Sequence, residues 1–170
     1  MLLVSGSGQN TGKTSLVCRL IKKFSSQIKV VGIKITHHFH PLAYEMPCIV
    51  ENEYFKIFEE TRKDQLKDSS RMLRAGSTRV FFVISDKHHL GKAMSELLVL
   101  LDQDIGLICE SGGLADFYQP GLHLHLTGPG NRNSKDNMTG FDLEIYYDGI
   151  EFNTGTENIV FEENNWILKN

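Results

Sequence analysis

Apolar and polar positions follow two different rhythms along the first two-thirds of the chain. Short runs of apolar and β-branched residues predict buried strands at residues 1–4, 28–35, 79–85 and 105–109. Residues 13–24 and 91–101 carry apolar side chains three or four positions apart, which predicts helices. Residues 54–74 are charged, rich in helix formers and followed by Ala75-Gly76, so they also read as a helix. Residues 37–54 contain two prolines and no clear period, which indicates a loop or lid.

This alternation of strands and helices predicts a mostly parallel sheet with helices on both faces, the α/β class. Ligands of such folds bind beyond the carboxyl ends of the strands, so the residues that follow each strand are the first candidates for a site. The sequence shows no internal repeat and no linker, and we therefore expect residues 1–170 to form a single domain.

The last third of the chain has a different pattern. Residues 122–126 (Leu-His-Leu-His-Leu) alternate as a half-buried strand does, which places His123 and His125 on its polar face. Residues 142–152 predict a hairpin with Asp148-Gly149 as its two-residue turn. We therefore expect antiparallel strands at the C-terminal end.

Composition limits the classes of function. With 41% hydrophobic and 23% charged residues the chain resembles a soluble globular domain, and a net charge of −3 gives no general reason to expect nucleic acid or an acidic membrane as partner. No stretch approaches the roughly 20 apolar residues of a membrane span. The first apolar run stops at Ser5, too early for a signal peptide, and Cys18, Cys48 and Cys109 form no close pair. We expect a reduced, cytoplasmic protein.

A glycine-rich segment joins the first predicted strand to the first predicted helix. It reads Gly6-Ser-Gly-Gln-Asn-Thr-Gly-Lys-Thr-Ser15 and matches the phosphate-binding pattern G-x-x-x-x-G-K-[ST], except that Ser7 stands where the first glycine is expected. Glycines let backbone N–H groups approach phosphates, and a helix N-terminus attracts anions. Lys13 would reach the β- and γ-phosphates, and the Thr14 hydroxyl would bind Mg²⁺. The alternative is a turn that binds nothing.

The segment thus predicts a site for a nucleoside triphosphate with Mg²⁺. The expected nucleotide ligands are Gly8, Gln9, Asn10, Thr11, Gly12, Lys13, Thr14 and Ser15. Glu110 ends a buried strand, where its carboxylate can hold Mg²⁺ directly or through water, unless it simply faces solvent. The turn Ser111–Gly113 offers consecutive N–H groups to an anion, or is only a tight turn.

Four segments resemble known P-loop families. The loop Gly6–Thr14 looks like those of the class that contains dethiobiotin synthetase and molybdopterin-guanine dinucleotide biosynthesis protein B. Gly32–His38 is similar to the Lys-x-Thr-His-His segment of the latter family. Lys67–Ser77 is similar to its Lys-Asp-Ser…Ala-Gly-Ala helix, and Leu107–Glu110 is similar to its Walker B strand. The segments occur in family order and cover the first two-thirds of the chain. Glu110-Ser-Gly-Gly-Leu114 is closer to dethiobiotin synthetase, and the last third has no match.

The resemblance implies a three-layer P-loop NTPase fold and adds two residues to the site. It implies that Asp68 binds Mg²⁺ together with Thr14 and Glu110, and that Lys34 lies near the γ-phosphate or the substrate. Lys13, Lys34 and Glu110 are then the catalytic candidates. Without the resemblance, Asp68 is an ordinary acid on a charged helix and Lys34 a surface lysine.

Three functions are compatible with these motifs. The first is an accessory protein of molybdenum cofactor (guanine dinucleotide) biosynthesis, which binds GTP, hydrolyses it slowly and acts together with a protein partner. The second is an ATP-dependent ligase or carboxylase of the dethiobiotin synthetase type, and the third is a nucleotide-dependent switch protein. Thr36–His38 favours the first, and the glycines after Glu110 favour the second. The preference for GTP over ATP rests on the resemblance alone, because Asn133–Asp136 contains the residues of the guanine-recognition motif in the wrong order. The oligomeric state stays open, with a homodimer among the alternatives.

Histidines cluster after the second predicted strand, at His37, His38 and His40. Imidazoles are common metal ligands, but no Cys or acid at a typical zinc spacing accompanies them. Donation to phosphate fits the resemblance better than a structural zinc.

Overall fold

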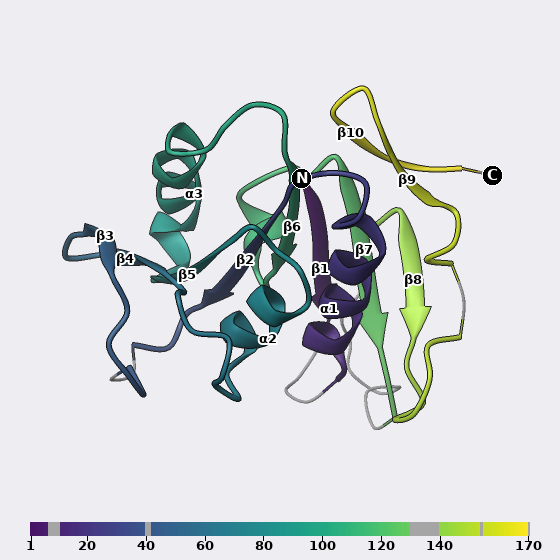
Figure 1. Cartoon of the computed structure of the whole chain (residues 1–170), viewed down its shortest axis with the longest axis horizontal. Coiled ribbons are helices and arrows are strands. Elements are labelled where there is room, and N and C mark those ends of the chain that lie inside the picture. Colours follow the sequence, from purple (N-terminus) through teal and green to yellow (C-terminus); the bar gives the residue numbers. More distant parts are fainter. Residues whose placement is uncertain (7–10, 40–41, 130–139, 154, 170) are drawn as a thin grey trace.

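A computed structural model describes residues 1–6, 11–39, 42–129, 140–153 and 155–169. Eight strands form one sheet in the order β3-β4-β5-β2-β6-β1-β7-β8 (Figure 1). They are β1 (Leu2–Gly6), β2 (Val30–Thr36), β3 (Cys48–Glu51), β4 (Phe55–Glu59), β5 (Arg79–Ser85), β6 (Gly106–Glu110), β7 (Leu122–Thr127) and β8 (Leu143–Tyr146). At one edge of the sheet β4 pairs antiparallel with both β3 and β5. The remaining neighbours in the sheet, from β5 through β2, β6, β1 and β7 to β8, all pair parallel. The prediction of a mostly parallel sheet is confirmed.

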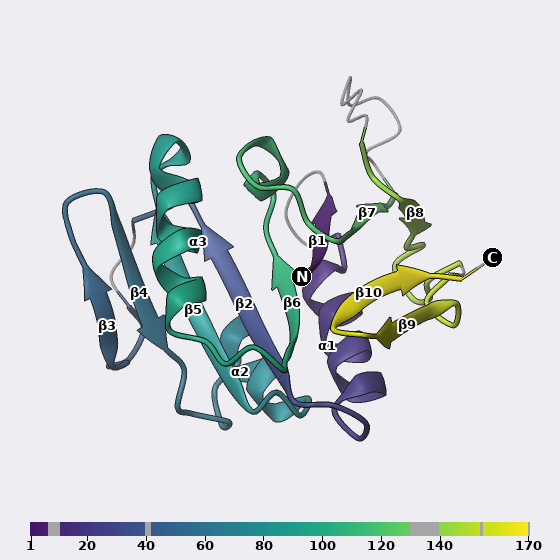
Figure 2. The same cartoon turned by 90° about the horizontal axis from the view of Figure 1, so that it is seen from above.

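Helices cover both faces of the sheet. Seen from above, α1 (Lys13–Phe24) and α2 (Asp68–Arg74) lie on one face and α3 (Leu90–Val99) on the other (Figure 2). Each face has its own apolar cluster, one beneath α1 and α2 and the other beneath α3. Two short 3₁₀ turns, η1 (Lys87–His89) and η2 (Leu114–Asp116), follow β5 and β6. The chain is an α/β structure of three layers.

The central strands lie where the apolar runs predict them. The strand predicted at residues 79–85 is confirmed without change, and β1, β2 and β6 differ from their predictions by one or two residues at each end. Leu2 and Val4 pack beneath α1, whereas Leu3 packs on the α3 side. Because both faces of a central parallel strand are covered, its sequence is a continuous apolar run without alternation.

The helix predicted over residues 54–74 is wrong in its first half. Phe55–Glu59 forms β4, and α2 begins only at Asp68. Phe55 and Ile57 are fully buried on the α3 side of the sheet, two positions apart, as strand residues are. Burial of these two large side chains outweighs the helix propensity of the charged residues around them. β3 lies within the predicted loop, and its mostly exposed residues give no burial pattern to detect.

The C-terminal antiparallel hairpin exists, but not at the predicted residues. β8 is parallel to β7, and a single antiparallel bridge between Tyr147 and Phe152 closes the segment predicted as a hairpin. The edge of β7 that β1 leaves open captures this segment as a further strand of the sheet. The hairpin pairs β9 (Ile159–Glu162) with β10 (Asn165–Leu168). Its turn residues Glu163 and Asn164 have φ of 50° and 61°, as a type I′ turn requires.

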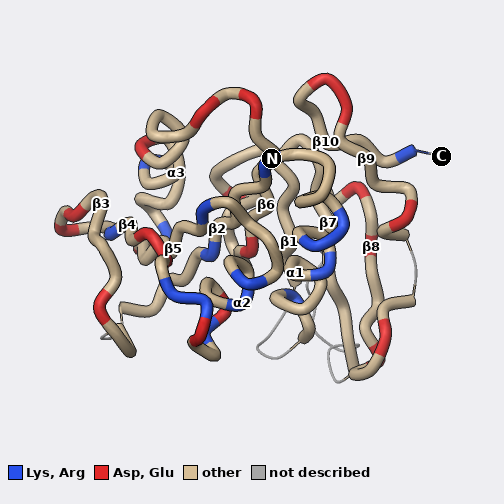
Figure 3. The backbone as a smooth tube through the Cα atoms, viewed as in Figure 1, with Lys and Arg blue, Asp and Glu red and all other residues tan. Residues whose placement is uncertain are grey.

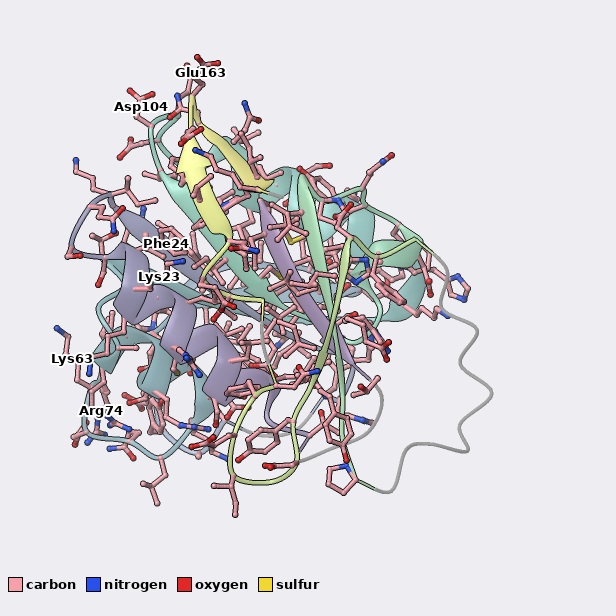
Figure 4. The ribbon with its side chains drawn as sticks, turned by 90° about the vertical axis from the view of Figure 1, so that its right-hand side faces the viewer. Lys23, Phe24, Lys63, Arg74, Asp104 and Glu163 are labelled. Carbon is pink, nitrogen blue, oxygen red and sulfur yellow. The ribbon has the colours of Figure 1, made fainter. Side chains whose placement is uncertain are left out.

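The β9–β10 hairpin is attached to the last turn of α1, where Lys23 and Phe24 lie beside it (Figure 4). The Lys23 ammonium donates to the carbonyl oxygens of Thr156 (2.6 Å) and Ile159 (3.0 Å). Phe24 packs edge-on against Trp166, with ring centroids 4.8 Å apart. The hairpin therefore fixes α1 at the end opposite to the glycine-rich turn.

His123 and His125 of β7 are buried, which corrects the prediction that they lie on an exposed face. They are only 3% and 4% exposed because the chain returns over them: the Gly140 carbonyl accepts from Nδ1 of His123 (3.2 Å), and Phe141 stacks on His125 at 5.3 Å between centroids. Ser5 Oγ lies 2.8 Å from Nε2 of His123 and 3.1 Å from Nδ1 of His125. Since a carbonyl oxygen only accepts, Nδ1 of a neutral His123 is the donor, and its Nε2 accepts a hydrogen bond from the Ser5 hydroxyl.

Replacing Ser5 by alanine should destabilise the protein, because the variant loses the hydroxyl that both buried rings use. A buried polar group that loses its partner costs about 1–3 kcal/mol, so we expect a decrease of that order in the free energy of unfolding in urea. Ser95→Ala is the matched control, since Ser95 is exposed on α3 and its hydroxyl donates to the Gly91 carbonyl one turn earlier. Equal stability of the two variants would contradict a structural role for the Ser5 hydroxyl.

Candidate functional site

A cleft of about 1020 Å³ lies at the carboxyl ends of the central strands, where the fold class predicts a ligand. Its walls come from the ends of β1, β2 and β6, the first turns of α1 and α2, and the turns after β5 and β6. The order β2-β6-β1 in the sheet brings together residues that are far apart in sequence (Figure 1).

The glycine-rich turn forms the β1 side of this cleft. Gly8, Gln9 and Asn10 lie outside the described residues, whereas Thr11, Gly12, Lys13, Thr14 and Ser15 line the cleft. Gly12 has φ of +87°, and a Cβ atom there would lie 2.7 Å from Cδ1 of Tyr147. Glycine is therefore required by both the backbone and the packing. Tyr147 belongs to the C-terminal third, which thus forms part of the cleft.

The Lys13 ammonium lies in the cleft next to the turn itself. It donates to the Gly6 carbonyl (3.2 Å) and to Oγ1 of Thr11 (2.9 Å). Burial lowers the pKa of Lys13, while Glu110 acts in the opposite direction. A partly desolvated ammonium that a carbonyl and a hydroxyl oxygen hold in place is well suited to receive an anion.

Strand register brings Lys34 next to Glu110. The two residues are direct neighbours on β2 and β6, on the face beneath α1 and α2, and the Lys34 ammonium donates to Oε1 of Glu110. The Thr14 hydroxyl in the first turn of α1 donates to Oε2 of the same carboxylate at 2.8 Å. The Glu110 side chain is only 3% exposed, so these two partners replace the water that its carboxylate has lost on burial. Glu110 does not face solvent.

Asp68 completes this group from the start of α2. Its Oδ2 lies 3.0 Å from the Lys34 ammonium. Burial alone would lower the pKa of Lys34, but the carboxylates of Glu110 and Asp68 outweigh that effect and raise it. Burial would raise the pKa of Asp68, but Lys34 dominates and lowers it. Thr14, Lys34, Asp68 and Glu110 form one polar cluster, which we call the acid–lysine cluster; it extends from the buried Glu110 to Asp68, whose side chain is 38% exposed.

Arg71 is a site residue that the sequence interpretation missed. Its guanidinium donates to Oγ of Ser15 at 3.1 Å and lies 3.5 Å from Oδ1 of Asp68. It therefore links α2 to the start of α1 and lines the cleft. The spacing Asp68-x-x-Arg71 was the available signal, because residues three apart share one face of a helix.

The turn after β6 is ordered by a side chain. Ser111 Oγ accepts from the N–H groups of Gly113 (3.3 Å) and Leu114 (3.2 Å), so these two donors are already used. The tight-turn interpretation therefore accounts for these two N–H groups, rather than the anion site.

His37 packs on Gly113, and its Nδ1 lies 3.2 Å from the Ser85 carbonyl. Because that carbonyl accepts the Nδ1 proton, neutral His37 presents an acceptor at Nε2.

The remaining predicted histidines differ in what the structure describes. His38 lines the cleft, and its N–H group donates to Oγ1 of Thr36 at 3.3 Å. His40 lies outside the described residues.

The charge of the cleft is positive although that of the chain is negative. Lys13, Lys34, Lys67, Arg71 and Lys87 line it, against Asp68, Glu110 and Asp116. Basic residues gather around α1 and α2, whereas acidic ones are frequent in peripheral loops and at the tip of the β9–β10 hairpin (Figure 3). This distribution suits a polyanionic ligand bound locally.

A smaller cavity of about 230 Å³ adjoins the cleft. The two spaces share Lys34, Thr36, His38, Lys67 and Asp68. The other residues around the small cavity are Leu42, Ala43, Tyr44, Met46, Ser69, Phe82 and Ile84. A mostly apolar space thus opens beside the acid–lysine cluster.

The donor atoms of the cluster fit Mg²⁺. Within the described ranges no group of three or more His, Cys, Asp or Glu residues is arranged to hold a metal ion. Mg²⁺ does not need such a group, because it commonly takes one or two carboxylates and completes its shell with phosphate oxygens and water. Thr14, Asp68 and Glu110 supply oxygen donors of that kind.

Comparison with protein families, with curated proteins and with solved structures finds no match to this chain. In the part of the chain that the structure describes, no helix has the length and apolarity to cross a membrane.

Proposed function

We propose that this chain is a P-loop protein that binds a nucleoside triphosphate with Mg²⁺ and hydrolyses it slowly. The observation that carries the proposal is the acid–lysine cluster at the start of α1. There a hydroxyl, two carboxylates and a lysine converge from four elements of the structure. A purely structural ion pair would need neither the Thr14 hydroxyl nor the adjoining positive cleft.

Each residue has a defined task in this proposal. Lys13 and the N-terminus of α1 bind the phosphates, since both present positive charge to the cleft. Thr14, Glu110 and Asp68 hold Mg²⁺, which neutralises charge on the phosphate oxygens when bound. Lys34 balances the two carboxylates and adds positive charge beside the γ-phosphate.

The finer proposal names GTP and an accessory role in the biosynthesis of the guanine dinucleotide form of molybdenum cofactor. It rests on the motif resemblance of Gly32–His38 and Lys67–Ser77. An accessory protein of this kind needs a protein partner, and its hydrolysis should be slow when it is alone. A homodimer is compatible with this role.

A second candidate is an ATP-dependent ligase or carboxylase. The observation in its favour is the small cavity beside Lys34, since such an enzyme needs a place for an acceptor next to the γ-phosphate. Phosphate release distinguishes the two. A panel of small carboxylates and diamines should leave the rate almost unchanged in an accessory protein. Strong stimulation by one compound, with ATP preferred over GTP, would establish the ligase instead.

Calorimetric titration with ATP and with GTP, each with and without Mg²⁺, tests the proposed function directly. We expect triphosphate binding that weakens by at least about tenfold when EDTA removes Mg²⁺, because the carboxylates of the cluster then repel the phosphates. We further expect GTP to bind more tightly than ATP. Failure of both nucleotides to bind with Mg²⁺ present would refute the proposal, and a preference for ATP would refute its finer form.

A further inference from the structure

The small cavity exists because α2 is short. α2 has seven residues and covers Val80 of β5 through Met72 and Leu73. Phe82 and Ile84 follow on the same face of β5, beyond the N-terminal end of the helix. The segment before β3 covers these two side chains instead and leaves a space between itself and the sheet.

A buried carboxylate holds this covering segment in place. Glu60 is only 2% exposed, accepts from Oγ of Ser69 at 2.7 Å, and also accepts from the Tyr44 hydroxyl. The Arg62 N–H group donates to its other oxygen at 2.9 Å. Burial, with Glu60 next in effect, raises the pKa of Tyr44 to about 12, so the phenol stays protonated as a donor. Tyr44 and Ser69 therefore turn their polar atoms toward Glu60.

The wall of the cavity is consequently mostly apolar. Its charged residues, together with Thr36 and His38, are those that it shares with the cleft, and we call this side its mouth. Its interior surface comes from the Tyr44 and Phe82 rings, the Met46 thioether and aliphatic side chains. At the mouth, Lys34 and Lys67 stand against the single carboxylate of Asp68. An apolar body with one negative charge at its end complements this arrangement, whereas a cation would meet two ammonium groups.

We propose that the small cavity binds a small aromatic carboxylate, with its ring between Tyr44, Met46 and Phe82 and its carboxylate directed to Lys34. The aromatic preference follows from the two rings and the thioether, which favour contact with a planar ring. A volume of about 230 Å³ holds roughly eight water-sized groups, which corresponds to a single ring with a short acidic side chain. The carboxylate would lie at the opening toward the phosphate cleft, on the side of the acid–lysine cluster.

This inference rests on the proposed function in one respect. Lys34 is paired with Glu110 and Asp68. If those carboxylates hold Mg²⁺, as the proposed function requires, they would balance less of the Lys34 charge, and its ammonium would be available to an anion. Binding of the aromatic carboxylate should therefore be tighter in the presence of Mg²⁺ and nucleotide.

Phenylacetate is the probe, titrated calorimetrically into the full chain with and without Mg²⁺ and a non-hydrolysable triphosphate analogue. We expect binding with the analogue present, at least about tenfold tighter than for phenylacetamide or phenethylamine, which lack the negative charge. Phe82→Trp should weaken phenylacetate binding at least about tenfold, because a strand side chain extends directly from the sheet into the cavity. Phe82→Met, which roughly conserves volume, should retain binding.

Met46→Trp, in the covering segment, provides a second cavity-filling variant if Phe82→Trp does not fold. The triphosphate analogue, titrated alone, must bind both variants as it binds the natural protein. If the analogue binds but phenylacetate does not, or if phenylacetamide binds equally well, the cavity proposal is refuted while the nucleotide site stands. If the analogue itself does not bind, the proposed function fails first.

Discussion

Lys13→Ala should abolish triphosphate binding and leave the fold intact. The ammonium is partly desolvated in the cleft, and its described contacts are to Gly6 and Thr11 of the glycine-rich segment. Hydrogen bonds to charged groups contribute about 1.5–3 kcal/mol each, and Lys13 is expected to reach two phosphates. We therefore expect affinity to fall by about 100-fold or more. A fluorescent triphosphate titration measures the loss, and thermal unfolding monitors the fold.

Lys22→Ala provides the matched control on the same helix. Lys22 is exposed and does not line the cleft, so both affinity and thermal midpoint should stay close to those of the natural protein. If Lys13→Ala binds triphosphate as tightly as Lys22→Ala, the segment is a glycine-rich turn without a phosphate role.

The sequence predicts the individual residues of the site better than their contacts. The sequence singles out Thr14 because it follows a glycine-lysine pair, and Glu110 because it follows an apolar strand. Lys34 contacts Glu110 because β2 and β6 are adjacent in the sheet and their register pairs these two residues. Strand order is a property of the whole sheet, and no local pattern of residues encodes it. The resemblance identified Lys34 and Asp68, and the structure shows that they share one ion pair.

The errors of prediction have local physical causes. β4 is short and flanked by charged residues, so its three buried side chains give a weaker signal than the helix formers around them. His123 and His125 alternate with leucines as exposed residues do, but Gly140 and Phe141 return to cover them. Contacts of this kind arise between segments distant in sequence, and alternation within one strand cannot reveal them.

The small cavity was missed for a related reason. Glu60 and Ser69 lay within the predicted helix 54–74, and Tyr44 within the predicted loop. Only the strand β4 brings Glu60 to the point where Ser69 and Tyr44 can both donate to it. An error in the type of one element therefore concealed the small cavity beside the acid–lysine cluster.

Glu110→Gln should separate hydrolysis from binding. Glutamine has the shape of glutamate and can still accept from the Thr14 hydroxyl, but it lacks the charge that balances Lys34 and holds Mg²⁺. Loss of one electrostatic group that acts on developing charge typically costs about 10²–10³ in rate. We expect hydrolysis to fall by about 100-fold and triphosphate affinity by less than about tenfold, because Lys13 and the N-terminus of α1 still bind the phosphates. Single-turnover phosphate release and equilibrium titration measure the two effects separately.

Asp116→Asn serves as the control for Glu110→Gln. Asp116 also lines the cleft, but its carboxylate lies 3.3 Å from Lys87 and Asp116 is not one of the residues of the acid–lysine cluster. Its neutralisation removes the same unit of charge from the cleft and should change hydrolysis by no more than about threefold, as expected of an exposed ion pair. If both variants slow hydrolysis equally, the effect is one of total charge. If Glu110→Gln alone slows it and binding is kept, the Glu110 carboxylate acts at the step in which the phosphate bond breaks.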